Sequence, residues 1–248
     1  MAMDPRNRAF TLGVGAASQA GVDEGLRSYM LRVYNYMGTG LALTGAMAFM
    51  VAHTPALLQL FYVQTAQGVQ PTMLAYVAMF SPLAFVLVLN FGLNRMSAST
   101  AQLVFWAFAA VMGLSMSHIF LTFTGASIAR VFFITSGMFL SMSLYGYTTK
   151  RDLSGMGSFL MMGLIGIIIA SVVNMFIGST MMQFIISVAG VLVFVGLTAY
   201  DTQGIKATYS AHDDSATSQK KAIHGALRLY LDFINLFMML LHLFGNRE

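Results

Sequence analysis

Two carboxylates, Asp201 and Asp232, stand inside long apolar runs of the chain, apart from the rest of its nine acidic residues. A carboxylate at the centre of a membrane helix costs about 2.5–3.5 kcal/mol on insertion scales, so such residues usually face a bundle interior or a water-filled cavity. If the two side chains meet, they cannot both ionise cheaply, and they share one proton as a coupled pair. The chemistry indicated is a proton-operated switch or a site for a divalent cation such as calcium.

Each aspartate also has a plainer interpretation. Arg228 precedes Asp232 by four residues, so an ion pair on one helix face could neutralise the charge. Alternatively, Arg228 extends to the cytoplasmic interface. Asn235 lies one turn after Asp232 and extends the same polar stripe. Asp201 could simply mark the edge of its helix, because polar residues follow it directly.

The elements that must position these residues are membrane helices. The chain has 248 residues, of which 57% are apolar and 9% charged, whereas a soluble domain carries about 25% charged residues. The apolar residues form runs long enough to cross a bilayer as helices, and the runs lack the in/out alternation of a barrel strand. We therefore predict an all-α polytopic membrane protein with seven transmembrane helices, at about residues 33–53, 72–93, 100–123, 127–147, 157–178, 182–205 and 222–244.

Loop charges predict the orientation of these helices. Residues 1–28 are polar and lack a signal-peptide core, so we predict a flexible cytoplasmic tail over 1–28 and a seven-helix membrane domain over 29–248. Lys and Arg occur in the tail and in the second, fourth and sixth loops, and are absent from the first and fifth. The positive-inside rule then places the N-terminus in the cytoplasm. Seven full spans would put the C-terminus outside, whereas a re-entrant last helix would keep it inside.

Several function classes lack their sequence signals. The absence of cysteine excludes disulfides, thiolate metal sites and cysteine nucleophiles, and no GxSxG, HExxH or phosphate-binding Gly-Lys-Ser/Thr loop is present. An intramembrane aspartyl protease also needs paired carboxylates, but "TAYDTQ" and "LYLDFINLF" lack the Gly-x-Gly-Asp context usual for such enzymes. We expect no enzymatic activity, no cofactor and, with a net charge of +4, no nucleic-acid partner.

Three segments resemble the signature segments of the transmembrane Bax inhibitor motif family, also called the Bax inhibitor or lifeguard family. They are "LYGYTTKRDLSGMGSFL" (144–160), "TAYDTQGIKATY" (198–209) and "LYLDFINLFMMLLHLFG" (229–245). The resemblance runs over nearly the whole chain from about residue 27 and is strongest to bacterial members. It implies a bacterial inner-membrane protein, built as a seven-helix bundle whose last helix is central and in one alternative re-entrant.

Members of this family are described as pH-sensitive calcium leak channels. The resemblance implies that Asp201 and Asp232 are the functional pair and that Arg95, after the second helix, engages them. Calcium would be the transported or bound ion, with Asp201 and Asp232 as its ligands. Bacterial members are also associated with regulation of a membrane-bound protease.

Our leading hypothesis from the sequence is a calcium leak channel gated by a proton that Asp201 and Asp232 share, with Arg95 pairing with them and Arg228 and Asn235 in support. A second hypothesis is a non-conducting regulator of a partner such as a membrane protease. A third is a proton-coupled cation exchanger. The expected partners are the lipid bilayer, calcium ions and protons, and the expected state is a monomer.

Overall fold

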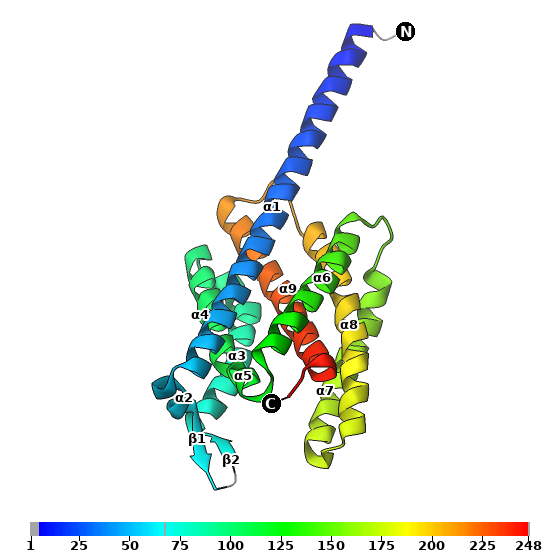
Figure 1. The fold of residues 1–248 in the computed structure, drawn as a ribbon. Coiled ribbons are helices and arrows are strands. Elements are labelled where there is room, and N and C mark those ends of the chain that lie inside the picture. The colour runs from blue at the N-terminus through cyan, green and yellow to red at the C-terminus, as the bar shows by residue number, and fades with distance from the viewer. Residues whose placement is uncertain (1–4, 67, 248) are drawn as a thin grey trace.

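Long apolar helices make up the computed structural model, which describes residues 5–66 and 68–247, with side chains from residue 23 onward. The elements in chain order are α1 (Pro5–His53), α2 (Pro55–Phe61), β1 (Tyr62–Thr65), β2 (Gly68–Pro71), α3 (Met73–Gly92), the 3-10 turn η1 (Leu93–Arg95), α4 (Ala98–Met116), α5 (Ile119–Thr122), α6 (Gly125–Thr148), α7 (Ser154–Ile177), α8 (Thr180–Ala207) and α9 (Ser215–Phe244). Figure 1 shows their arrangement.

The helices confirm the predicted all-α polytopic membrane fold. Six described helices are long and apolar enough to cross a membrane, and a seventh span is counted if α1 from Asp23 and α2, which meet at 96°, are taken together. Large apolar side chains cover the outer surface; Phe80 on α3 is 67% exposed and Phe176 on α7 is 82% exposed. Exposed apolar patches on this scale suit contact with lipid rather than water.

Polar residues between the apolar runs begin the helices. Five side chains accept a hydrogen bond from the backbone N–H three residues later and so cap a described helix: Thr72, Ser97, Thr124, Ser179 and Asp214. Such caps satisfy backbone donors that have no partner inside the helix. The polar breaks that separate the predicted spans therefore act as helix start signals.

The first loop is more ordered than the sequence predicts. Thr54 is extended before Pro55, as residues before proline prefer, and this ends α1 and turns the chain into α2. Strands β1 and β2 then pair antiparallel, with Tyr62 opposite Pro71, and Gly68 adopts φ +104° at the turn. The hairpin lies at the end of the bundle away from the start of α1 (Figure 1).

The boundary predicted at residue 28 is not a break in the structure. Helix α1 continues through it from Pro5, and residues 1–4 lie outside the described residues. Tyr29, Met30 and Val33 are buried, and the Tyr29 ring lies 5.6 Å from the Tyr209 ring. With Leu26, they recur at helical spacing, so this face packs on the bundle although the segment is polar in composition.

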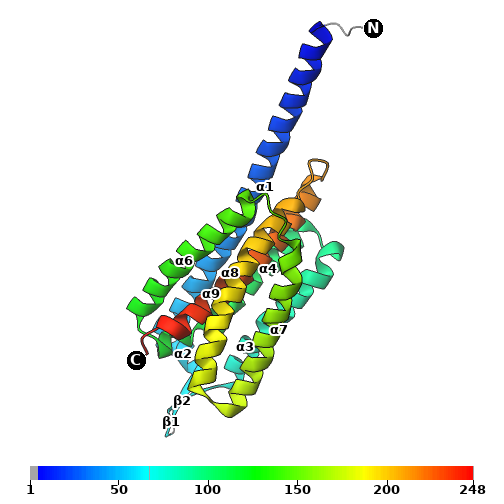
Figure 2. The ribbon, with the colours of Figure 1, turned by 90° about the vertical axis from the view of Figure 1, so that its right-hand side faces the viewer.

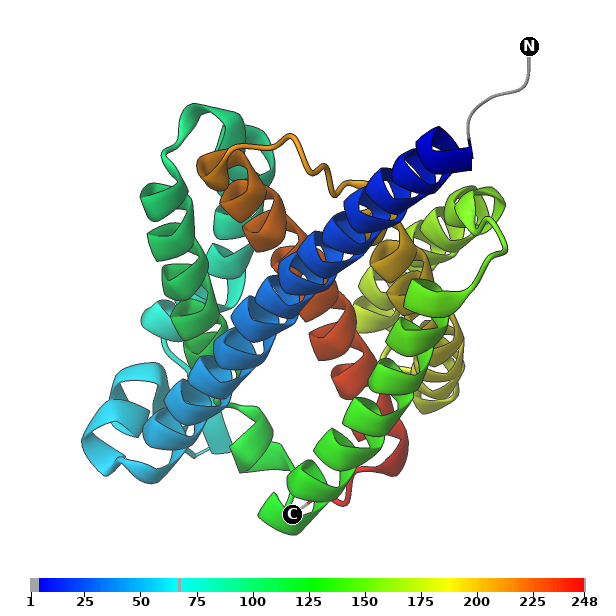
Figure 3. The same cartoon turned by 90° about the horizontal axis from the view of Figure 1, so that it is seen from above.

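Helix α9 is central, as the family resemblance implies. Helices α8, α1, α6 and α4 pack around it, which Figure 3 shows from above. Figure 2 shows α7 beside α8 at the periphery. Buried apolar residues occur along most of α9, including Leu229, Leu236 and Leu241.

Helix α9 is also continuous, which argues against the re-entrant alternative. It ends at Phe244, and the following backbone pairs with the start of α6: Thr124 N donates to Asn246 O at 3.1 Å, and Asn246 N donates to Ser127 Oγ at 2.9 Å. Residue 247 thus lies at the end of the bundle opposite the α8–α9 connection (Figure 1). Which end faces the cytoplasm stays a prediction.

Candidate functional site

The structure brings Asp201 and Asp232 to neighbouring helices. Asp201 lies near the end of α8, six residues before Ala207 and roughly 9 Å from that terminus. Asp232 lies in the middle of α9, which packs along α8. The two residues are 7% and 5% exposed and are the buried charged residues of the described chain. This placement is consistent with the case, which the sequence allows, in which the two side chains meet.

Asp201 forms an ion pair with Arg228 across the two helices. Arg228 Nε donates to Asp201 Oδ2 at 3.1 Å, and Arg228 Nη2 donates to Asp201 Oδ1. Such two-pronged pairing is the strong geometry between a guanidinium and a carboxylate. The Arg228 side chain is 36% exposed, so one side of the pair is open toward the helix end. The pair fastens α8 to α9.

Asp232 has no such partner. Its Oδ2 atom is buried and accepts no hydrogen bond within the described part of the chain. Its carboxyl group interacts with that of Asp201 both through like charge and through a side-chain hydrogen bond between the two carboxyl groups. The local Arg228–Asp232 ion pair that the four-residue spacing allows is not formed, because Arg228 turns to Asp201 instead. The cluster therefore holds one guanidinium and two carboxyl groups.

The structure does not bring Arg95 or Asn235 into this cluster. Arg95 ends the turn η1, is exposed, and forms no ion pair with Asp201 or Asp232 among the described side chains. Asn235 Nδ2 donates to Leu231 O of its own helix at 2.8 Å. The cation in contact with the site is Arg228. Arg228, which the sequence hypothesis gave only a supporting role, therefore forms the ion pair expected of Arg95.

His224 continues the polar stripe toward the end of the bundle, and its place was missed from the sequence. Its Nε2 atom lies 3.1 Å from Asn90 Oδ1 at the end of α3, and it interacts electrostatically with Arg228 and Asp201. His224, Arg228 and Asp232 are spaced by four residues and so share one face of α9. That spacing is the signal that could have identified it.

The two residues after Asp201 hold its helix in place. Thr202 Oγ1 lies 2.9 Å from Ser143 Oγ on α6, which in turn lies 2.5 Å from Tyr34 Oη on α1. The Gln203 amide closes the α6–α7 connection, since Oε1 accepts from Leu153 N and Nε2 donates to Arg151 O, both at 2.8 Å. Side-chain hydrogen bonds of this kind help to fix membrane helices in rotation.

A calcium site is not assembled in this arrangement. The described residues contain no cluster of three or more His, Asp or Glu side chains that could hold a metal ion. Calcium takes six to eight oxygen ligands, and Arg228 already occupies both oxygens of Asp201. Calcium could use both carboxylates only after Arg228 has moved away.

Comparisons with known proteins agree with the resemblance of the three signature segments. The family described as "Inhibitor of apoptosis-promoting Bax1" matches residues 26–248. "Uncharacterized protein RP147" of Rickettsia prowazekii is 48% identical over 226 residues, which cover 91% of this chain and 92% of that protein. "Inner membrane protein YbhL" of Escherichia coli is 45% identical over 226 residues, or 90% of this chain and 94% of that protein.

A more distant relative is an uncharacterized membrane protein of Streptococcus pyogenes. It is 35% identical over 226 residues, which cover 91% of this chain and 96% of that protein. The match of the family extends over all the apolar helices of the bundle and includes the aspartates on α8 and α9. The chain therefore belongs to the Bax inhibitor or lifeguard family of membrane proteins.

Proposed function

We propose that the protein is a pH-sensitive calcium leak channel whose closed form is held by the Arg228–Asp201 ion pair beside a protonated Asp232. The observation that supports this most directly is the buried Asp232 Oδ2 atom, to which no described group donates a hydrogen bond. The neighbouring carboxylate of Asp201, in contrast, accepts from Arg228. The family resemblance supports the same residues. Arg228 replaces Arg95 as the cation of the closed state.

The charge count of the cluster supplies the gating mechanism. With Asp232 protonated, one guanidinium balances one carboxylate, and the α8–α9 contact is electrically neutral. When Asp232 loses its proton, two carboxylates face a single guanidinium in a poorly solvated site, which costs free energy unless water or a cation enters. Separation of α8 from α9 would admit both. Calcium conduction should therefore rise as pH rises through the titration of the pair.

The position of the cluster suits a gate near one end of the bundle. Asp201 is close to the end of α8, and the half-buried side chains of Arg228 and His224 extend the polar stripe toward the same end. Beyond Asp232 the face of α9 becomes apolar, with Leu236 and Leu240 buried. Opening would need to separate these apolar contacts as well as the ion pair.

Calcium flux into proteoliposomes at a series of pH values tests this mechanism. Wild type should conduct more as pH increases, whereas Asp232→Asn, which stays neutral, should keep a low flux with little pH dependence. Asp201→Asn should leave Arg228 unpaired and raise the flux at acidic pH. Asp213→Asn is a matched control, because Asp213 forms its ion pair with Lys221, 2.6 Å away, outside the cluster. Wild-type pH profiles in both cluster variants would contradict the gating mechanism.

The same assay separates the other candidate functions. Proton-coupled exchange also uses a buried carboxylate without a partner, and it predicts that an imposed pH gradient drives calcium movement stoichiometrically. A non-conducting regulator of a membrane protease or another membrane protein predicts no flux in liposomes that contain this protein alone. A leak channel predicts flux down the calcium gradient without a pH gradient.

A further inference from the structure

A groove between α1 and α6 opens sideways on the membrane-facing surface. Three adjoining cavities form it, with volumes of about 360, 480 and 310 Å³. The first and second share Tyr34 and Leu140, and the second and third share Leu41, Gly45, Phe132 and Phe233. In Figure 3, α1 and α6 diverge and α9 lies beneath the space between them. The cavities therefore form one continuous groove with α9 as its floor.

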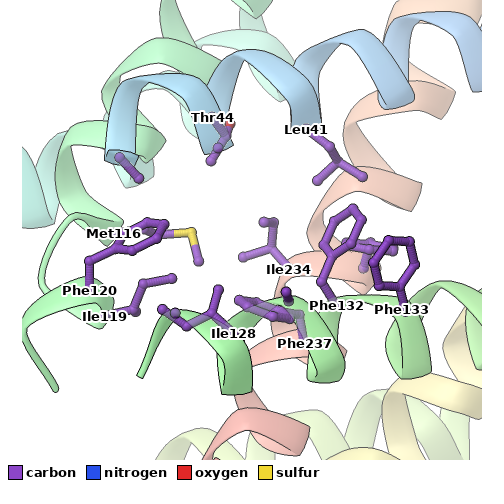
Figure 4. Close-up of a pocket in the computed structure, with 15 residues that line it drawn as sticks. Leu41, Thr44, Met116, Ile119, Phe120, Ile128, Phe132, Phe133, Ile234 and Phe237 are labelled. Atoms are coloured by element: carbon purple, nitrogen blue, oxygen red, sulfur yellow. The ribbon is translucent and has the colours of Figure 1, made fainter. Parts of the chain in front are cut away.

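The walls of this groove are hydrocarbon and aromatic. Figure 4 shows the cavity farthest from Arg27, where Phe132, Phe237 and Ile234 surround an apolar space. The Phe132 ring lies 5.5 Å from the Phe233 ring and 6.4 Å from the Phe237 ring. Leu140, which lines the other two cavities of the groove, is 61% exposed. Hydroxyl groups that line the groove, on Tyr34, Thr44, Ser136 and Ser143, already have hydrogen-bond partners within the protein, so the walls fit an alkyl chain.

The other end of the groove is basic. Arg27 lines it and is exposed, and no ion-pair partner of Arg27 occurs in the described chain, although Asp23 and Glu24 precede it by one turn. Tyr147 lies in the same cavity, and Lys206 Nζ is 5.0 Å from the centre of its ring. This end therefore presents positive charge beside an apolar channel, which complements an anionic headgroup joined to an acyl chain.

The length of the groove also suits a lipid. Arg27 and Gly45 are eighteen residues apart on α1, or roughly 27 Å along the helix axis. The hydrocarbon core of a bilayer is about 30 Å thick, so a chain from one leaflet would fill the half of the groove nearer Arg27 and reach its middle. Phe132 and Phe233 line that middle part.

We propose that this groove binds an anionic phospholipid, with the phosphate at Arg27 and one acyl chain between α1 and α6 on the floor made by Phe233. The lipid would lie close enough to influence α8 and α9, the two helices that carry the aspartates. Phe233 follows Asp232 on α9, and Tyr34 in the groove wall is linked through Ser143 to Thr202, which follows Asp201.

Native mass spectrometry of the full-length protein in detergent, titrated with phosphatidylglycerol or phosphatidylcholine of identical acyl chains, tests the headgroup contact. Wild type should retain phosphatidylglycerol preferentially. Arg27→Gln should weaken phosphatidylglycerol binding about fivefold, the effect of one cation near an anionic headgroup, and leave phosphatidylcholine binding unchanged. Arg151→Gln is the matched control, an exposed arginine outside the groove, and should bind as wild type. Equal retention of both lipids by wild type would overturn the proposal.

A second pair of variants tests the acyl-chain channel. Gly38 lines the middle of the groove and has no atom within 4 Å of a Cβ position, so Gly38→Leu should fold and fill the channel. It should abolish retention of phosphatidylglycerol. Gly137→Leu, on α6 and equally unobstructed, should retain it. Undiminished lipid binding by Gly38→Leu would overturn the proposal, as would loss of a protein dimer in that variant, which would assign the groove to a second copy of the chain.

Discussion

At the scale of single residues, the charges of the cluster are unequally satisfied. Both oxygens of Asp201 accept from Arg228, whereas Asp232 Oδ2 accepts from no described donor. An ion pair that loses one member leaves an uncompensated charge, and the cost grows with burial. Arg228 is thus the residue on which the closed arrangement depends most.

Substitution of Arg228 tests that dependence. Arg228→Gln should lower the free energy of unfolding by roughly 1–3 kcal/mol, between the values for exposed and buried pairs, because Arg228 is partly exposed. It should also raise calcium flux at acidic pH, where wild type is closed. Thermal unfolding in detergent and proteoliposome flux measure the two effects.

Arg95→Gln is the informative comparison for that variant. Arg95 is exposed and pairs with neither aspartate in the described structure, so its removal should change stability and flux little. If Arg95→Gln alters the pH profile more than Arg228→Gln does, the assignment of Arg228 is wrong and the expectation from the family resemblance is right.

At the scale of elements, glycines set how closely the helices around the cluster approach. A Cβ atom at Gly146 on α6 would lie 2.2 Å from Ala199 O on α8, and one at Gly157 on α7 would lie 2.6 Å from the Tyr200 ring. Small residues permit such contacts between membrane helices. Both glycines fall in the signature segment 144–160.

A pair of alanine substitutions on α6 measures this close approach. Gly146→Ala should destabilise the protein by about 1–3 kcal/mol, because α6 must move away from the α8 backbone. Gly137→Ala, where a Cβ meets nothing within 4 Å, should be neutral or stabilising by up to about 1 kcal/mol through helix propensity. Equal melting temperatures for the two variants would contradict the packing argument.

The start of α9 depends on an acidic cap outside the apolar span. Asp214 Oδ1 accepts from Thr217 N at 3.3 Å, and hydrogen bonds from the Thr217 side chain and, to a lesser extent, from this backbone N–H hold the pKa of the Asp214 carboxyl below its ordinary value. A lowered pKa in the folded state means that the cap stabilises α9 above the unfolded pKa of about 3.9 and is lost as pH falls through the folded value. The cap should therefore be fully present at neutral pH.

Backbone hydrogen exchange of residues 216–219, corrected for the intrinsic rate at each pH, measures the cap. Asp214→Ala should increase exchange at neutral pH and match wild type at strongly acidic pH. Asp214→Asn is the control, because asparagine caps a helix comparably but does not titrate. It should preserve protection at both pH values; loss of protection in Asp214→Asn at neutral pH would show that the negative charge, and not the cap, holds the first turn.

At the scale of the whole molecule, the basic connections gather at one end. The connections between α6 and α7 and between α8 and α9 lie at the end from which α1 extends, and the hairpin and the α7–α8 turn lie at the other (Figure 1). The cationic loops of the sequence therefore share one side, as the positive-inside rule requires. Residue 247 lies toward the opposite side.

Cysteine labelling tests the predicted orientation, since the chain has no cysteine of its own. In intact cells in which the reagent reaches only the outer side of the inner membrane, an impermeant thiol reagent should label Ala66→Cys in the hairpin and Arg247→Cys near the C-terminus. Ser210→Cys, between α8 and α9, should react only after permeabilisation. Wild type supplies the background. Labelling of Ser210→Cys before Ala66→Cys would reverse the orientation.

Local properties of the chain determined much of the structure. Hydropathy predicted the helices, because a span needs about twenty apolar residues whatever its neighbours are. The polar break at Ser97 lies close to the start predicted at residue 100, since a cap bonds only three residues ahead, whereas α9 begins at Ser215 rather than at the predicted residue 222. Asp201 and Asp232 stood out because a charge in an apolar run is costly in any bundle. The hairpin and the packed face of α1 at residues 26–33 were missed, since their stability comes from neighbouring segments.

Tertiary structure alone decided which charges meet and where the bundle opens to lipid. The sequence offered Arg228 to Asp232 by spacing and Arg95 to both aspartates by resemblance, yet the structure pairs Arg228 with Asp201. That choice depends on the rotation of α8 and α9 about their axes. The groove between α1 and α6 depends likewise on the angle at which these helices diverge over α9. Rotation and crossing angle arise from the packing of many side chains at once, so no local stretch of sequence encodes them.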